Sequence, residues 1–299
     1  MLQETSRTSR KWGAQSAVAP LRRALLCPPN WTAAGAARAD LGYWGYTTPP
    51  DLGKATSELD ALAEVLAAAG VSVERHVTAQ DGVYDAVFAC DWGIVVNDGA
   101  IVLNAGKPAR RREADIAEAA FRECGVPVLH RMGSPATAEG GDLLWLNPSL
   151  LLVGRTYRTN AEGLAELRSL LAPRGVTVVS SPVPHFHGQG SVMHLLSLIS
   201  LVDRDLAVVY LPLLAVETVE LLRAEGVELL EITPGEFENL GCNILALGPR
   251  HCLVVAGNPR VRRELEKRRV RVEEFPDAEL GLNMGGGPTC LVQAVLRDF

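Results

Sequence analysis

The feature that most restricts the fold of this chain is a unit that recurs about five times. In each unit an amphipathic helical stretch ends at a turn residue, and a short strand-like run opening with Val follows. Glycine suits this turn because the left-handed backbone at a helix C-terminus costs little without a Cβ. The junctions lie 43 to 55 residues apart, at Gly70-Val71, Gly125-Val126, Gly175-Val176, Gly226-Val227 and Arg269-Val270.

The helical stretches carry apolar stripes, and pairs of strand-like runs precede the later ones. In the first stretch Leu59, Leu62, Leu66 and Ala69 follow helical spacing, and Ser57 is the expected N-cap. Two short apolar runs separated by a polar turn indicate two adjacent strands. The paired runs are 93–96 with 100–103, 143–146 with 150–153, 198–202 with 206–210, and 244–247 with 252–255.

Repeats of this period are typical of units stacked around an axis or along a solenoid. A doubly wound parallel sheet explains the alternation of helices and strands but not the paired strands. A closed ring of ββαβ blades around a central channel explains both, and we favour it. No linker divides residues 19–299, which we expect to form one domain. The polar start, residues 1–18, is predicted to be a disordered extension, with a targeting peptide as the alternative.

Composition excludes several classes of function. The chain is 47% hydrophobic and 21% charged, as in an average soluble globular protein. Its net charge of −6 argues against a nucleic-acid partner, and no apolar run approaches the length of a membrane helix. The six scattered cysteines form no Cys-x-x-Cys pair, which favours reduced thiols in a cytoplasmic protein. The oligomeric state is not determined, and a homodimer is left open.

Four segments combine residue types that carry chemistry. Cys290 follows a tight Gly-Gly-Gly-Pro bend that would present its sulfur at a loop edge, and His194 precedes an apolar run. The other two segments are Glu139-Gly140-Gly141-Asp142 and the pair Asp85 and Asp91. Each alone is also explained as a turn, a cap or a satisfied core residue. Because the four segments fall in different repeats, a ring would bring them together at its axis.

Taken together, the motifs resemble the dimethylarginine dimethylaminohydrolase family and, more broadly, the arginine deiminases and amidinotransferases. The resemblance extends from about Leu25 to the C-terminus and implies a five-bladed α/β propeller with the site in its channel. The motifs, in order, are Phe88-Ala89-Cys90-Asp91, Pro108-Ala109-Arg110-Arg111-Arg112-Glu113, Glu139-Gly140-Gly141-Asp142, Arg158-Thr159-Asn160, His194-Leu195-Leu196-Ser197 and Gly286-Gly287-Pro288-Thr289-Cys290.

The resemblance implies a role for each matching residue. Cys290 is the expected nucleophile, His194 the general acid and base, and Glu139 the acid that orients His194. The substrate would be a small guanidino compound. Its expected ligands are Asp91 for the guanidinium, Asp85 for the α-amino group, and Arg158 with either Arg110 or Arg111 for the carboxylate.

These residue types suit an attack on a guanidinium carbon. That carbon is stabilised by resonance, so it needs a strong nucleophile and a carboxylate that fixes its orientation. A thiolate stabilised by the bound cation or by protonated His194 meets the first need. The implied products are citrulline and an amine, formed through an S-alkylthiouronium intermediate. We expect neither a cofactor nor a metal, because His185-Phe186-His187 has no third ligand at useful spacing.

Two departures from the family pattern leave the substrate open. Cys90 stands where dimethylarginine-hydrolysing relatives often carry glutamate, and Leu196 stands where deiminases and amidinotransferases tend to have aspartate. Hydrolysis of unmodified arginine and amidino transfer to an amine are the nearest alternatives. A non-catalytic binding propeller and a cysteine protease are alternatives from other classes. The aromatic, glycine-containing segment from Asn30 to Asp51 is expected either to close over the site as a lid or to pack against the ring.

Overall fold

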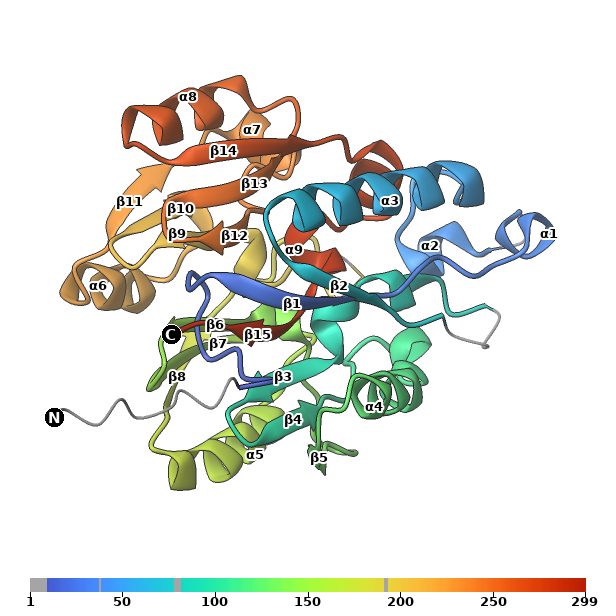
Figure 1. Ribbon diagram of the computed structural model, residues 1–299, viewed down its shortest axis with the longest axis horizontal. Helices are drawn as coiled ribbons and strands as arrows, with labels where there is room; N and C mark the ends of the chain where they lie inside the picture. The colour runs from blue at the N-terminus through green and yellow to red at the C-terminus, as the bar shows by residue number, and fades with distance from the viewer. Residues whose placement is uncertain (1–9, 38, 78–81, 191–192) are drawn as a thin grey trace, which may run out of the picture.

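The computed structural model describes residues 10–37, 39–77, 82–190 and 193–299 and arranges their strands in five three-stranded sheets (Figure 1). In each sheet the inner strand is antiparallel to the middle strand, which is parallel to the outer strand. From inner to outer, the sheets are β3 (Gly93–Val96), β4 (Gly99–Val102) and β5 (Val128–Arg131); β6 (Leu143–Asn147), β7 (Leu150–Arg155) and β8 (Thr177–Pro182); β9 (Ile199–Asp203), β10 (Leu206–Val209) and β11 (Glu228–Glu231); β12 (Leu245–Gly248), β13 (His251–Val255) and β14 (Arg271–Phe275); and β15 (Gln293–Arg297), β1 (Leu21–Leu26) and β2 (Ser72–Arg75).

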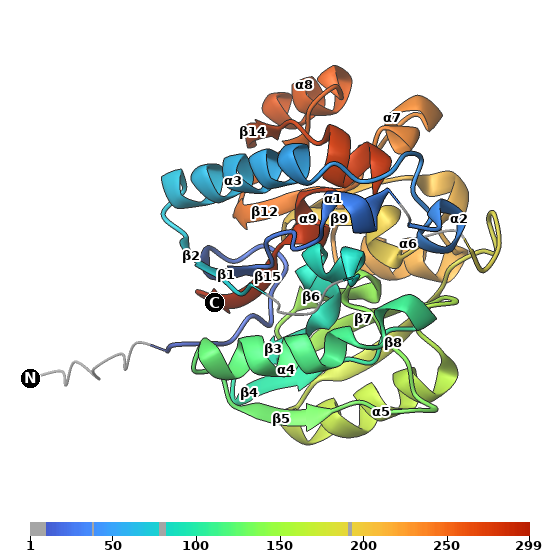
Figure 2. The same ribbon diagram turned by 90° about the vertical axis from the view of Figure 1, so that its right-hand side faces the viewer.

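A helix connects the middle strand of each sheet to the outer strand, and both views show these helices on the outside (Figures 1 and 2). A parallel pair needs such a crossover, so each unit is a ββαβ blade. The crossover helices are α3 (Leu52–Ala68), α4 (Glu113–Glu123), α5 (Ala161–Leu171), α6 (Val216–Ala224) and α8 (Pro259–Lys267). Shorter helices are α1 (Ala33–Ala36), α2 (Leu41–Trp44), α7 (Pro234–Glu238) and α9 (Pro288–Leu291).

The five blades surround a common cavity. Residues from all five inner strands, β3, β6, β9, β12 and β15, line it. The predicted ring of five blades around a central channel is therefore confirmed, and the doubly wound sheet is wrong. The four strand pairs read from the sequence correspond to β3–β4, β6–β7, β9–β10 and β12–β13.

The two ends of the described chain complete the remaining blade. Strand β15 pairs antiparallel with β1, so that the last strand in the sequence becomes the inner strand of the first blade. Gly13 adds to this seam, because its N–H donates to Val295 O at 2.9 Å and its carbonyl accepts from Arg297 N at 2.9 Å. The N–H of Ala14 donates to Val95 O at 2.8 Å in the neighbouring blade.

This seam corrects one prediction. Disorder was expected over residues 1–18, but Gly13 and Ala14 hydrogen-bond to β15 and β3, and Val18 is buried in the core. Pairing with the strand edges satisfies the backbone polar groups of Gly13 and Ala14. Residues 1–9 lie outside the described part of the chain.

The helix ends agree with the sequence pattern at all five junctions. Gly70, Gly125, Gly175 and Gly226 have φ between 72° and 82°, and Arg269 adopts the same left-handed region with φ 61° despite its side chain. The prediction that Ser57 is the N-cap of this helix is wrong. Helix α3 begins earlier because the Asp51 carboxylate accepts a hydrogen bond from Lys54 N, and a negative charge at a helix N-terminus is favourable.

The apolar stripe of α3 is buried as predicted. Leu59, Leu62 and Leu66 are each at most 1% exposed and pack in one cluster with residues of β1, β12 and the segment before α3. In the part of the chain that the structure describes, no helix has both the length and the apolar composition that crossing a membrane requires.

We expect Leu62→Ala to lower the free energy of unfolding by about 2–5 kcal/mol, because it leaves a cavity under α3. Glu64→Ala, an exposed position on the same helix, is the control and should change the unfolding free energy by less than about 0.5 kcal/mol. Urea unfolding followed by circular dichroism measures both. Equal losses in the two variants would show that α3 does not contribute through its buried face.

Candidate active site

The candidate catalytic residues occupy similar positions in different blades. Each lies on the short turn that leads into an inner strand: Asp91 precedes β3, Glu139 precedes β6, His194 precedes β9, and Cys290 precedes β15. Because the inner strands surround the channel, their leading turns meet at one end of it. The ring thus brings together residues that are up to 199 positions apart in the sequence.

The structure places most of the predicted site residues around one polar pocket. An apolar pocket adjoins it, and His194 and Cys290 line both pockets. Glu139 is fully buried and bonds to His194, whereas Arg111 is exposed and lies outside both pockets. The polar pocket is lined by Trp44, Asp85, Phe88, Asp91, Lys107, Arg110, Arg158, His194, Met284, Gly285, Gly286 and Cys290.

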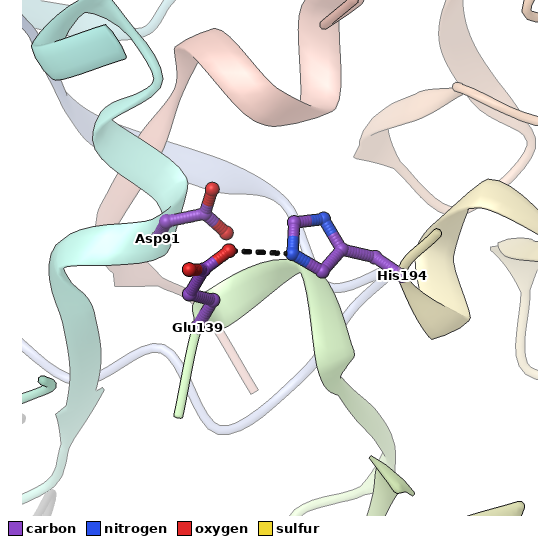
Figure 3. A group of neighbouring side chains, drawn as sticks. All are labelled: Asp91, Glu139 and His194. Atoms are coloured by element: carbon purple, nitrogen blue, oxygen red, sulfur yellow. Dashed lines mark hydrogen bonds and ion pairs between the residues drawn. The ribbon is translucent and has the colours of Figure 1, made fainter. Parts of the chain in front are cut away.

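Glu139 and His194 form a hydrogen-bonded pair. Figure 3 shows the imidazole directed at the Glu139 carboxylate beside Asp91, and the Nε2···Oε2 distance is 2.8 Å. Arg158 donates to the same oxygen at 3.1 Å, and the backbone N–H of Lys107 donates to Oε1 at 3.2 Å. Burial alone would raise the pKa of Glu139, but Arg158, His194 and Arg110 hold it well below its usual range. The carboxylate is therefore charged at neutral pH.

Three carboxyl groups act on the imidazole of His194. Burial lowers its pKa, but Asp91, Asp142 and Glu139 raise it by more, to about 9. Asp142 also fixes the chain at this point, because its Oδ1 accepts from Leu195 N at 3.0 Å. His194 is accordingly protonated at neutral pH and can donate a proton to a leaving group.

Asp91 is oriented by two donors. Its Oδ1 accepts from Gly141 N at 2.7 Å, and its Oδ2 accepts from Arg110 Nη1 at 2.5 Å. Arg110 is itself held in a bidentate pair with Glu113, with both N···O distances 2.8 Å. Its Nη2 also donates to the carbonyls of residues 85 and 88 at 3.3 Å each, so most of the donors of Arg110 are already used by the protein. Its role as a carboxylate ligand stays a prediction.

The carboxylate of Asp85 accepts hydrogen bonds from two side chains. Tyr46 Oη donates to one carboxylate oxygen at 2.5 Å, and Lys107 Nζ donates to the other at 2.6 Å. Burial and Asp85 raise the pKa of Tyr46 well above its usual value. Lys107 also donates to Trp44 O at 2.7 Å. The described part of the 30–51 segment thus packs against the site, with Trp31, Trp44 and Tyr46 buried, and whether it opens as a lid stays a prediction.

The glycines of two motifs are explained by close contacts. A Cβ on Gly140 would lie 1.9 Å from Cys90 O, and one on Gly141 would lie 2.4 Å from the His194 ring. Beside the nucleophile, a Cβ on Gly286 would meet Phe88 at 2.4 Å, and one on Gly287 would meet Asn243 at 2.7 Å. Side chains at these positions would push apart the turns that carry the site.

The Cys290 thiol is half-buried. Burial and Asp91 raise its pKa to about 12, while a hydrogen bond from Asn243 lowers it. The thiol is therefore protonated in the free protein at neutral pH, and a cation placed beside it would favour the thiolate.

The second pocket beside Cys290 and His194 is largely apolar. Its walls include Phe186, Met193, Leu196, Phe237 and Leu240, and the rings of Phe186 and Phe237 meet edge to face at 6.0 Å. Cys90 lines both this pocket and the central channel. Its thiol removes the charge that a glutamate would place there.

The site also contains a group of potential metal ligands. One ligand atom from each of Asp91, Glu139 and His194 lies within 4.8 Å of the others. Both carboxylates, however, are already paired with the guanidinium groups of Arg110 and Arg158. Two fixed cations repel a divalent metal ion more strongly than a singly charged organic cation, which hydrogen bonds to the carboxylates can also hold. The arrangement therefore suits an organic cation better than a metal ion. His185 is outside this group, and its Nδ1 lies 2.6 Å from Tyr157 Oη.

Sequence reasoning missed three residues that the structure adds to the site. Lys107 pairs with Asp85, Glu113 pairs with Arg110, and Asn243 contacts Cys290. Asn243 precedes β12 as the other candidates precede their inner strands, so its place in the repeat was a usable signal. The partner of Lys107 is 22 residues away and belongs to another segment, which no local pattern reveals.

Comparison with known proteins gives a consistent picture. The family model for "N,N dimethylarginine dimethylhydrolase, eukaryotic" matches residues 51–297. The N(G),N(G)-dimethylarginine dimethylaminohydrolase of Streptomyces coelicolor is 30% identical over 210 residues, which cover 70% of this chain and 74% of the relative.

Two solved structures share the fold. The dimethylarginine dimethylaminohydrolase of Pseudomonas aeruginosa, a cysteine-to-serine mutant complexed with citrulline, superposes with a TM-score of 0.74 at 21% identity. This match covers 91% of this chain and 98% of the other. The N-terminal domain of ArgZ, an arginine dihydrolase from cyanobacteria, gives a TM-score of 0.78 at 19% identity and covers 92% and 97%.

The raised pKa of His194 predicts a pH-dependent contribution to stability. A folded-state pKa of about 9, above the ordinary 6.5, means that the contribution is complete below about pH 6.5 and is lost as the pH rises through about 9. Relative to His194→Gln, the wild type should therefore lose unfolding free energy between about pH 6 and about pH 10. Denaturant unfolding at each pH measures this difference. A difference that stays constant would show that His194 is not charged in the folded protein.

Proposed function

Because this chain belongs to the N,N-dimethylarginine dimethylhydrolase family, we propose that it hydrolyses a guanidinium C–N bond of arginine or an Nω-methylated arginine. The products are citrulline and ammonia or a methylated amine. The observation that carries the proposal is that Cys290 and His194 line one cavity, with His194 hydrogen-bonded at 2.8 Å to the buried Glu139.

Substrate binding activates the nucleophile. The guanidinium group binds at Asp91, whose two oxygens are already oriented by Gly141 N and Arg110. Asp91 raises the pKa of Cys290 in the free protein, so a cation between the two groups weakens that repulsion. The thiol proton leaves to solvent, and the thiolate attacks the guanidinium carbon.

His194 then transfers protons in both halves of the reaction. As the Sγ–C bond forms and the C–N bond breaks, protonated His194 gives its proton to the departing nitrogen. The amine leaves, and the S-alkylthiouronium group remains on Cys290. Neutral His194 takes one proton from the attacking water as the C–O bond forms. The C–S bond then breaks with the thiolate as the leaving group, the remaining hydroxyl proton passes to the sulfur, and citrulline is released. Proton transfer of this kind contributes about 10²–10⁴-fold to the rate.

The other end of the substrate meets charged groups of both signs. We assign the α-amino group to Asp85, which is buried in the polar pocket, and the carboxylate to Arg158. Arg158 also lines a neighbouring pocket with Arg155, Tyr157 and His185, and the described residues that line this pocket include donors but no carboxylate. A guanidinium fork binds a carboxylate through two hydrogen bonds, which suits this position.

The apolar pocket supports a methylated substrate. A substituent on the guanidinium nitrogen that extends away from Asp91 would enter the walls formed by Phe186, Leu196 and Phe237. Burying a methyl group against these apolar side chains is favourable. We therefore rank asymmetric dimethylarginine and monomethylarginine above arginine.

A ureido-product assay tests the proposal with arginine, monomethylarginine and asymmetric dimethylarginine supplied separately. The wild type should form citrulline, with the methylated substrates preferred, and Cys290→Ser should reduce the rate at least about 10³-fold because serine is a far weaker nucleophile. Cys124→Ser, a cysteine outside the site, is the matched control and should keep full activity. If Cys290→Ser retains turnover, the thiolate mechanism is wrong. If an added amine acceptor yields amidinated product in place of citrulline, the enzyme is a transferase.

Arg158→Lys should raise KM at least about tenfold with a smaller effect on kcat, because a lysine keeps the charge beside Glu139 but lacks the fork. Steady-state kinetics measures both constants. Arg112→Lys makes the same exchange at an exposed position and should leave both constants unchanged. An unchanged KM in Arg158→Lys would place the carboxylate elsewhere.

A further inference from the structure

The side chain of Asn243 is in direct contact with the sulfur of Cys290. Its Nδ2 lies 3.1 Å from Sγ, and its Oδ1 accepts a hydrogen bond from Thr289 N at 3.0 Å. A backbone N–H can only donate, so the amide oxygen must face Thr289. The two N–H donors of the amide are then on the side of the sulfur. The orientation of Asn243 is therefore fixed by the residue next to the nucleophile.

Asn243 has the same place in its blade as the catalytic candidates have in theirs. It stands two residues before β12, just as Asp91 stands two residues before β3. With Asn243 included, all five blades supply a polar side chain at this end of the channel. The blade of β12 thus contributes a neutral donor to a site where the other contributions are charged or nucleophilic.

Several features hold Asn243 in place. The residue is 7% exposed, and Gly287 provides the space for it, since a Cβ there would lie 2.7 Å from Asn243 Cγ. Its own backbone N–H donates to Leu240 O at 2.8 Å. Leu240 has φ 55°, a left-handed conformation that a branched side chain rarely adopts. Strained residues of this kind persist where the surroundings impose them and are concentrated at active sites.

Most of the groups around the sulfur oppose its ionised form. Burial, Asp91 and Asp277 act against the thiolate, the charge of Arg110 acts for it more weakly than the hydrogen bond from Asn243, and Asn243 donates directly to the sulfur. A donor stabilises a charged acceptor more than a neutral one. We propose that Asn243 is a positioning residue that holds the Cys290 sulfur in line for attack and favours its thiolate form. This inference rests on the proposed role of Cys290 as the nucleophile.

Two substitutions separate this role from a structural one. Asn243→Leu keeps the approximate volume and removes both hydrogen bonds. Asn243→Asp keeps the shape and the acceptor for Thr289 N but turns a negative oxygen toward the sulfur. A structural role predicts that the aspartate variant resembles the wild type, whereas a donor role predicts that it is the more impaired of the two.

The measurement is the rate of Cys290 alkylation by iodoacetamide at a fixed pH, on the full chain without substrate. The rate of the corresponding Cys290→Ser protein is subtracted to remove the other thiols. Losing a hydrogen bond to a charged group shifts a pKa by about one to two units, and the higher nucleophilicity of the more basic thiolate offsets part of this. We therefore expect a fall of roughly 3- to 10-fold in Asn243→Leu and a larger fall in Asn243→Asp.

Asn239→Leu is the matched control in the same loop, because its amide donates to Ala256 O, and it should alkylate at the wild-type rate. Thermal unfolding verifies that each variant is folded. If Asn243→Leu is unfolded, the alkylation rate of Asn243→Asp alone tests the donor role. Wild-type alkylation in a folded Asn243→Asp would overturn the inference while leaving the thiolate mechanism intact. Turnover retained in Cys290→Ser would instead refute the proposed function.

Discussion

The antiparallel pairing of β15 with β1 is the interaction on which both the fold and the site depend. It joins strands from opposite ends of the described chain and turns five units into a ring. Without it the inner strands would have no common axis. Cys290 lies three residues before β15, so the same pairing places the sulfur beside turns of the other blades. Bonds from Gly13 to residues 295 and 297 reinforce the seam.

Charge compensation is the second constraint. Asp85, Asp91, Glu113 and Glu139 are all buried, and each has a cationic partner among Lys107, Arg110, Arg158 and His194. Unpaired buried charges would be costly, so these groups hold one another in fixed positions. The result is a polar pocket next to an apolar one. The thiol of Cys290 and the imidazole of His194 line both pockets. Such a division suits a substrate with a charged group and an apolar substituent.

Much of this could be predicted from the sequence because the relevant signals are local. Helix stripes, left-handed junctions and paired strands each depend on neighbouring residues, and all reappear in the structure. The order of the motifs indicated the family. It also indicated that Asp91, Glu139, His194 and Cys290 belong to one site. Ser57 was wrong as an N-cap because the Asp51 carboxylate caps an earlier turn. The disorder expected over residues 1–18 was wrong at Gly13, because this residue pairs with β15, which begins 280 residues later in the sequence.

The sequence by itself determined the repeating unit, the number of blades and the residue types that reach the channel, because periodicity and turn chemistry act over a few residues. Tertiary structure decided which strand closes the ring and which groups compensate each charge. It paired Lys107 with Asp85, enclosed Arg110 between Asp91 and Glu113, and set Asn243 against Cys290. Hydrogen bonds and ion pairs between distant segments depend on distances of a few ångströms, and only the packed ring fixes those distances.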